Sequence, residues 1–134
     1  MNLFQLPFHL RTGLWGEHKA EEFLKTKGHR ILGRRVRVSL RDELDLVVRD
    51  GEVLVFVEVK TRQTEAFGRP FASVDRRKRH VLSRAAVRYL QHLKAPVMFR
   101  FDVIEVIGRE GDVCPVIRHI ENAFTLDRCY TLPW

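Results

Sequence analysis

A glutamate and a lysine, two residues apart, interrupt an apolar run at residues 54–62, LVFVEVKTR. The surrounding residues are typical of a buried strand, whereas Glu58 and Lys60 carry charge into it. Burying a lone carboxylate or ammonium costs on the order of several kcal/mol unless another group compensates the charge. The simplest compensation is an ion pair between Glu58 and Lys60, or escape of both side chains to solvent at a sheet edge.

A hairpin brings further carboxylates toward the same place. The pair Asp50-Gly51 is typical of a tight turn between two strands. A two-residue turn there places Glu43 opposite Glu58 and makes Asp45 the diagonal neighbour of Glu58. Because side chains alternate along a strand, Glu43, Asp45 and Glu58 then project from one face together with Lys60.

Clustered carboxylates repel each other, and a divalent cation would relieve that repulsion. A hard ion such as Mg²⁺ or Mn²⁺ takes a few carboxylate oxygens, keeps several waters and leaves room for phosphate. The predicted ligands are Asp45, Glu58 and the backbone carbonyl of Val59. Lys60, roughly 6.5 Å further along the same face, would hold the scissile phosphate or orient the attacking water. These residues predict metal-dependent phosphodiester hydrolysis.

A helix over residues 14–27, ended by Gly28, contributes one more acid. Glu17, Ala20 and Leu24 fall on one helical stripe, which predicts that Glu17 lies on the sheet-facing side. The dipole of the first helical turn would also favour a glutamate there without any catalytic role. Glu21 is expected to face solvent or, at most, to lie at the boundary of the buried face.

The remaining elements complete an α/β fold. The expected order is helix, three strands (in 29–40, 43–50 and 52–61), a helix capped by Ser73 and reaching about Leu93, and strands in 97–107 and 113–120. The long helix between the third and fourth strands predicts that they run parallel, giving a mixed sheet. Pro115 places the last strand at an edge. One domain spans 1–134, with a core of about 13–120 and an unassigned tail over 121–134.

The charge balance favours a polyanionic partner. Lysine and arginine number 24 against 17 aspartates and glutamates, a net charge of +7. A nucleic acid, DNA first, is therefore the predicted partner. A solvated charged face is the alternative for the basic segment that opens the second helix. The predicted phosphate contacts are Arg62, Arg76, Arg77, Lys78 and Arg79.

Other features argue for a cytoplasmic location. The two cysteines, Cys114 and Cys129, form neither a disulfide framework nor a zinc motif, which suits a reducing compartment. The first ten residues make a poor signal peptide, and no apolar run approaches the roughly 20 residues of a membrane span.

The ordered motifs resemble the PD-(D/E)XK nuclease superfamily, the restriction-endonuclease-like fold. Asp45 followed by Glu58-Val59-Lys60 matches its motif, and Glu17 is similar to the helix glutamate of archaeal Holliday-junction resolvases. This resemblance implies that Glu17 assists catalysis through a water or a second ion. The closer resemblance is to the YraN-like family of small bacterial proteins. It covers about residues 13–107, with Asp42 standing where that family usually has glycine. The segments that carry it are GE at 16–17, ELDLVVRDG at 43–51, FVEVKTR at 56–62, FG at 67–68, VDRRK at 74–78 and RFDVIEV at 100–106.

The resemblance implies an αβββαβ core and a metal-dependent, endonuclease-like phosphodiesterase that can be structure-specific. Two alternatives stay open at this point. One is a nucleic-acid-binding module that kept the fold without cleavage, and the other is an accessory subunit whose site a partner completes. A resolvase-like role would need two sites, and therefore a homodimer.

Overall fold

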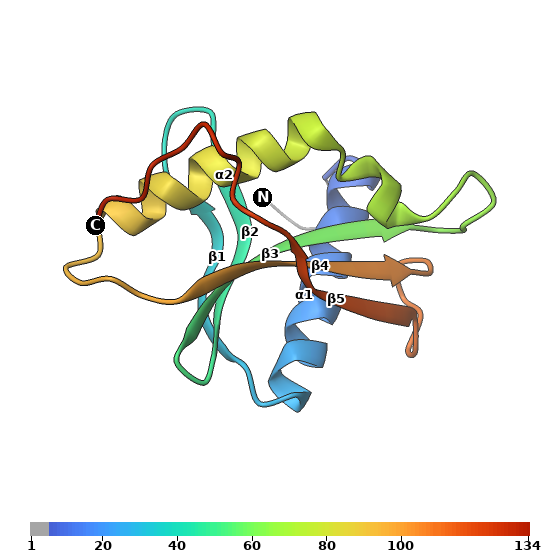
Figure 1. Cartoon of the computed structure of the whole chain (residues 1–134). Helices are drawn as coiled ribbons and strands as arrows, with labels where there is room; N and C mark the ends of the chain where they lie inside the picture. Colours follow the sequence, from blue (N-terminus) through green and yellow to red (C-terminus); the bar gives the residue numbers. More distant parts are fainter. Residues whose placement is uncertain (1–5) are drawn as a thin grey trace.

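A computed structural model describes residues 6–134 as a helix–sheet–helix sandwich (Figure 1). The sheet has five strands in the order β1-β2-β3-β4-β5, with β3 and β4 parallel and the other neighbours antiparallel. This confirms the predicted α/β class, the αβββαβ order and the parallel crossover. The elements are α1 (Phe8–Thr26), β1 (Arg30–Arg37), β2 (Glu43–Asp50), β3 (Val53–Arg62), η2 (Pro70–Ser73), α2 (Arg76–Gln91), β4 (Phe99–Ile107) and β5 (Val116–Phe124).

Each face of the sheet is buried under one helix, which explains the continuous apolar run in β3. On that strand Leu54 and Phe56 belong to the cluster packed beneath α2. Val55, Val57 and Val59 belong to the cluster beneath α1. Strands covered on both faces lose the usual alternation of apolar and polar residues. A charged residue on β3 therefore enters a space that is apolar on both sides.

The sheet forks beyond Leu46 and Val57, the last pair that joins β2 to β3. From there β2 stays paired with β1 as far as Glu43, while β3 stays paired with β4 as far as Arg62. We call this separation of β2 from β3 the fork. Since neither strand has a sheet partner on that side, backbone and side-chain groups facing the fork are free to bind something else.

The hairpin differs in register from the prediction. Asp50 pairs with Val53, so the turn is formed by Gly51 and Glu52 rather than by Asp50 and Gly51. Gly51 has a positive φ of 60°, which suits the first position of such a turn. The pairing therefore shifts by two residues. An even shift keeps the predicted faces where the two strands are paired, since Val47 packs beneath α2 and Leu46 and Val48 pack beneath α1.

Both helices begin at residues other than those predicted. Helix α1 starts at Phe8, six residues before Leu14. Helix α2 is capped by Asp75, whose carboxylate accepts the backbone N–H of Lys78 at 2.9 Å. Ser73 instead ends the short helix η2. Within residues 6–134, no helix combines the length and apolar character needed to cross a bilayer.

The predicted edge strand is confirmed, and the tail beyond it is ordered. β5 lies at the end of the sheet and continues to Phe124. The C-terminal segment then runs back alongside α2 (Figure 1). Leu126 and Leu132 pack against the cluster beneath α2, and the N–H of Asp127 donates to Ser83 Oγ at 2.9 Å. The segment 125–134 is thus part of the folded domain.

Candidate active site

Asp45 and Glu58 lie together at the fork. Asp45 lies on β2 next to Leu46, in the part of the strand that no longer pairs with β3. Its Oδ2 accepts the backbone N–H of Val59 at 2.9 Å. The side chain thereby replaces a missing strand partner. Glu58 is only 6% exposed, and the charge of Asp45 contributes to raising its pKa. The two acids that the sequence placed diagonally are therefore neighbours, because the observed register sets them directly across the fork.

The backbone of Val59 adds a third oxygen. In an extended strand the N–H and C=O of one residue point to the same edge. Since the N–H of Val59 faces Asp45, its carbonyl faces the fork as well. The carboxylates of Asp45 and Glu58 with the Val59 carbonyl make an all-oxygen donor set, of the kind that Mg²⁺ and Mn²⁺ prefer.

Two lysines compensate Glu58 only in part. Lys60 Nζ lies 3.9 Å from one carboxylate oxygen, and Lys78 Nζ lies 3.5 Å from the other. Burial and the carboxylate of Asp45 nevertheless raise the pKa of Glu58 to about 8. The contact made by Lys78 confirms that α2 reaches toward the motif. The two lysines lower the pKa of Glu58 without outweighing burial and Asp45, so the protonated form of Glu58 stays favoured.

A close helix–strand contact positions Glu17. A Cβ added to Gly16 would stand 1.9 Å from Thr61 Oγ1 and 2.9 Å from its Cβ, so only glycine lets α1 approach β3 this closely. The next residue, Glu17, consequently borders a pocket of about 370 Å³ that is also lined by Val59, Lys60 and Arg62. The predicted sheet-facing position of Glu17 is confirmed.

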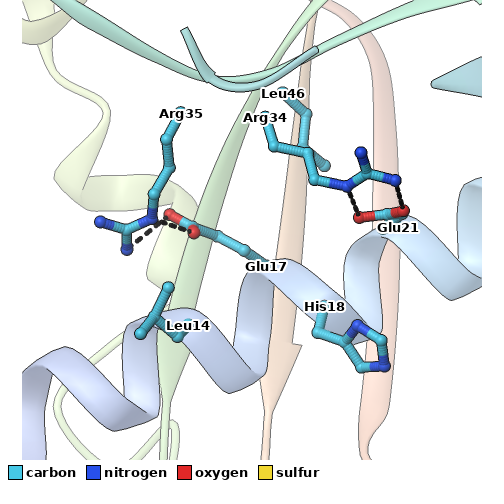
Figure 2. Close-up of a pocket in the computed structure, with 7 residues that line it drawn as sticks. All are labelled: Leu14, Glu17, His18, Glu21, Arg34, Arg35 and Leu46. Atoms are coloured by element: carbon cyan, nitrogen blue, oxygen red, sulfur yellow. Dashed lines mark hydrogen bonds and ion pairs between the residues drawn. The ribbon is translucent and has the colours of Figure 1, made fainter. Parts of the chain in front are cut away.

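Glu17 also borders a second hollow, of about 440 Å³, on the side of β1 (Figure 2). There Arg35 Nε donates to its carboxylate at 2.8 Å. Burial and the charge of Asp45 raise the pKa of Glu17, and Arg35 opposes that rise. The acid is therefore held between an arginine and the fork.

The neighbouring acid on α1 is buried, so its predicted solvent exposure is wrong. Arg34 binds Glu21 through two nitrogens, with Nε 2.7 Å from Oε2, and lowers the pKa of Glu21 to about 2 (Figure 2). Consecutive arginines reach α1 because Arg35 has a φ of 44°, which breaks the alternation of β1. A left-handed residue inside a strand has no sequence signal here.

The predicted basic residues divide into three groups. Arg76 and Arg77 are exposed on the first turn of α2, and Arg62 is exposed beside the pocket at Lys60. Arg79 is held by the fold: its Nε donates to the carbonyl of Val74 at 3.0 Å. Its guanidinium also lies 5.5 Å from each of two ring centroids, those of Phe71 and Phe124. Lys78 instead contacts Glu58 at the fork.

Glu43 does not join the site. Its predicted place opposite Glu58 is wrong, because the register shift and the fork carry it away from β3. Glu43 is exposed and lies 3.7 Å from Arg37, its partner on β1. The preceding residue, Asp42, is buried and bound by Arg84 through two 2.8 Å hydrogen bonds. Its φ is not positive, so this backbone position does not require glycine.

Sequence reasoning missed Glu105, a fully buried acid on β4. Its carboxylate accepts from Arg69 at 2.8 Å, from the N–H of Phe71 at 2.7 Å and from Arg118 at 3.1 Å. These bonds fix the segment between β3 and α2. An isolated acid in an apolar strand, the same signal that marked Glu58, was available at this position.

The αβββαβ order, the mixed sheet and the forked strands with paired acids define a restriction-endonuclease-like core. The chain belongs to the uncharacterised protein family UPF0102, the YraN family, whose model matches residues 16–106. The matched range holds every residue of the candidate site and ends within β4. It therefore leaves β5 and the C-terminal segment outside.

Bacterial relatives extend this match over most of the chain. A UPF0102 protein of Caldicellulosiruptor saccharolyticus is 43% identical over 110 residues, 81% of this chain and 92% of the relative. A UPF0102 protein of Symbiobacterium thermophilum is 46% identical over 117 residues, 85% of this chain and 96% of the relative. One from Pelotomaculum thermopropionicum is 47% identical over 114 residues, 84% of this chain and 93% of the relative. These names assign the family and no activity.

Proposed function

We propose that the protein is a metal-dependent phosphodiesterase that cleaves nucleic acid, with DNA as the first candidate substrate. The observation that carries the proposal is the state of Glu58. It is buried beside Asp45, has two lysines within 3.9 Å, and still has a pKa raised to about 8. A divalent cation at the fork would displace the proton of Glu58 and pair with both carboxylates, which the lysines do not achieve.

The residues divide into ligands and groups that act on the substrate. Asp45 and Glu58 would hold Mg²⁺ or Mn²⁺ together with the carbonyl of Val59. A bound cation would supply activation of water and offset charge on the leaving oxygen. Lys60 lines the pocket beside the metal ligands, where its ammonium can pair with a phosphate oxygen. Glu17 borders the same pocket and would accept a proton or orient a water.

Arginines outside the fork would position the substrate backbone. Arg62 is exposed at the pocket mouth, and Arg76 and Arg77 are exposed at the start of α2, the helix whose Lys78 touches Glu58. Guanidinium groups bind phosphate well and read no sequence there. Such contacts support affinity for nucleic acid without fixing which structure is cut.

A binding module without cleavage is the second candidate, and one observation favours it. Protein cations already contact two of the acids, since Arg35 pairs with Glu17 at 2.8 Å and Lys78 pairs with Glu58 at 3.5 Å. A site that had lost its metal would retain such ion pairs. The nuclease should bind a divalent cation at the fork, whereas the binding module should not.

The test is a cleavage screen over linear duplex, single-stranded, flap and junction DNAs with Mg²⁺ or Mn²⁺. Glu58→Gln and Lys60→Met should abolish cleavage and keep binding to the same DNAs. Glu52→Gln is the matched control, because Glu52 is exposed in the turn at the other end of the β2–β3 hairpin. If no DNA is cut and neither metal raises the melting temperature, the binding module replaces the nuclease.

A further inference from the structure

A second cluster of ligating side chains lies where the C-terminal segment runs alongside α2 (Figure 1). His80 Nδ1 lies 3.0 Å from Asp127 Oδ2 and 3.8 Å from Cys129 Sγ. Among residues 6–134, this is the one set of three His, Cys, Asp or Glu residues whose ligand atoms all lie within 4.8 Å of one another. The acids of the fork do not form such a set.

We propose that His80, Asp127 and Cys129 bind a zinc ion. Zinc takes nitrogen at about 2.0–2.1 Å, sulfur at about 2.3 Å and carboxylate oxygen at about 2.0–2.2 Å, in tetrahedral geometry. Ligands at those lengths stand roughly 3.4 Å apart for nitrogen and oxygen, and roughly 3.6 Å for nitrogen and sulfur. The observed 3.0 and 3.8 Å differ from these by a few tenths of an ångström. A water would complete the fourth position.

The chemistry of this set separates it from the fork. Thiolate and imidazole select zinc over magnesium, whereas the fork offers only oxygen. His80 and Asp127 are partly exposed and Cys129 is exposed, so the ion can enter from solvent. On binding, the Cys129 thiol proton leaves to solvent, and the sulfur donates its electron pair to the metal.

Tyr130 supports the same arrangement from the second nitrogen of the ring. Its hydroxyl lies 3.1 Å from His80 Nε2. In the metal-free protein, a neutral His80 ring with its proton on Nδ1 donates to Asp127 and accepts from Tyr130 at Nε2. With the metal on Nδ1, the imidazole proton resides on Nε2 and is donated to the Tyr130 oxygen. A partner of this kind fixes the tautomer of a ligating histidine.

Zinc at this position would fasten the C-terminal segment to α2. Asp127 and Cys129 come from that segment, and His80 is two residues beyond Lys78, which contacts Glu58. The ion would therefore steady the part of α2 nearest the fork. None of its three ligands takes part in the proposed cleavage, so the two proposals stand or fall separately.

Titration of the reduced, metal-depleted full-length protein with Co²⁺ tests the site, because thiolate ligation produces an intense charge-transfer band. The band should appear with one Co²⁺ per chain and be displaced by Zn²⁺. Cys129→Ser should remove it, while Cys114→Ser, which changes the other exposed cysteine, should leave it intact. Asp45→Asn should also leave it intact.

Two further measurements keep the test decisive. Zn²⁺ should slow alkylation of Cys129 and not of Cys114. Tyr130→Phe should keep the band and weaken Zn²⁺ binding by about tenfold or more, the usual effect of losing a group that orients a ligand. The proposal is overturned if no thiolate band forms, or if the band survives Cys129→Ser. Equal alkylation rates with and without Zn²⁺ would overturn it too.

Discussion

The ammonium of Lys78 lies 3.5 Å from the carboxylate of the buried Glu58, joining the basic start of α2 to the acids at the fork. This positive charge lowers the pKa of Glu58, against the larger effects of burial and Asp45. Removing it with Lys78→Gln should raise that pKa further. Because a cation must displace the proton, the response to metal should move to higher pH.

The measurement is the rise in melting temperature caused by Mg²⁺, followed from about pH 6 to about pH 9. Arg77→Gln is the control, since Arg77 is the adjacent residue on α2 and is exposed. Equal pH profiles for the wild type and Lys78→Gln would contradict the electrostatic role of Lys78.

Glu58 should make the metal-free protein less stable as the pH rises. Its pKa is about 8 in the folded protein against an ordinary value of 4.5, so the folded state holds the proton more tightly. The stability that this proton contributes is full below about pH 4.5 and is lost as the pH rises toward about 8. Between about pH 4.5 and about pH 8, the melting temperature of the wild type should fall relative to that of Glu58→Gln. Parallel curves for the two proteins would exclude a raised pKa.

Metal binding should depend on Asp45 more than on Lys60. A ligand that binds only the folded state stabilises it by mass action. Mg²⁺ or Mn²⁺ should therefore raise the melting temperature of the wild type, and Asp45→Asn should remove most of that rise. Lys60→Met should keep the rise and lose cleavage. If Asp45→Asn responds to metal as the wild type does, the ion does not bind at the fork.

The two glycines of α1 should respond oppositely to alanine. Gly16→Ala places a methyl group against Thr61 and should cost about 1–3 kcal/mol of unfolding free energy, as overpacking usually does. Gly13→Ala meets nothing within 4 Å and should stabilise the helix by about 0.5–1 kcal/mol. Urea denaturation of both variants measures the difference. Equal effects would mean that the contact between Gly16 and Thr61 does not set the approach of α1.

The exposed arginines of α2 should contribute to DNA binding, and Arg79 to stability. Replacing Arg76 and Arg77 with alanine should reduce the slope of log affinity against log salt by about 1 for each DNA phosphate that the variant no longer neutralises. Arg79→Ala should instead lower the melting temperature, because Arg79 packs on Phe71 and Phe124. An unchanged salt slope in the double variant would assign Arg76 and Arg77 to a solvated face.

The fold and the residue types of the site could be predicted because they depend on local patterns. The apolar run of β3 and its acid-x-lysine motif indicate which side chains share a face of the sheet. The helix before β4 indicates the parallel crossover. The exact pairing of the hairpin could not be predicted, since Gly51 can occupy either turn position. The fork depends on where β2 stops pairing with β3, which no local pattern encodes. The left-handed Arg35 and the partners of Glu105 likewise arise from contacts distant in sequence.

The hydrogen bond from the Val59 N–H to Asp45 has a consequence for how a cation would bind. One oxygen of Asp45 accepts from the backbone, which holds the carboxylate in place beside Glu58. Folding therefore already brings Asp45 and Glu58 together, and the associated loss of conformational entropy does not weaken binding of the ion. A cation would enter a preorganised site, where little rearrangement accompanies its binding.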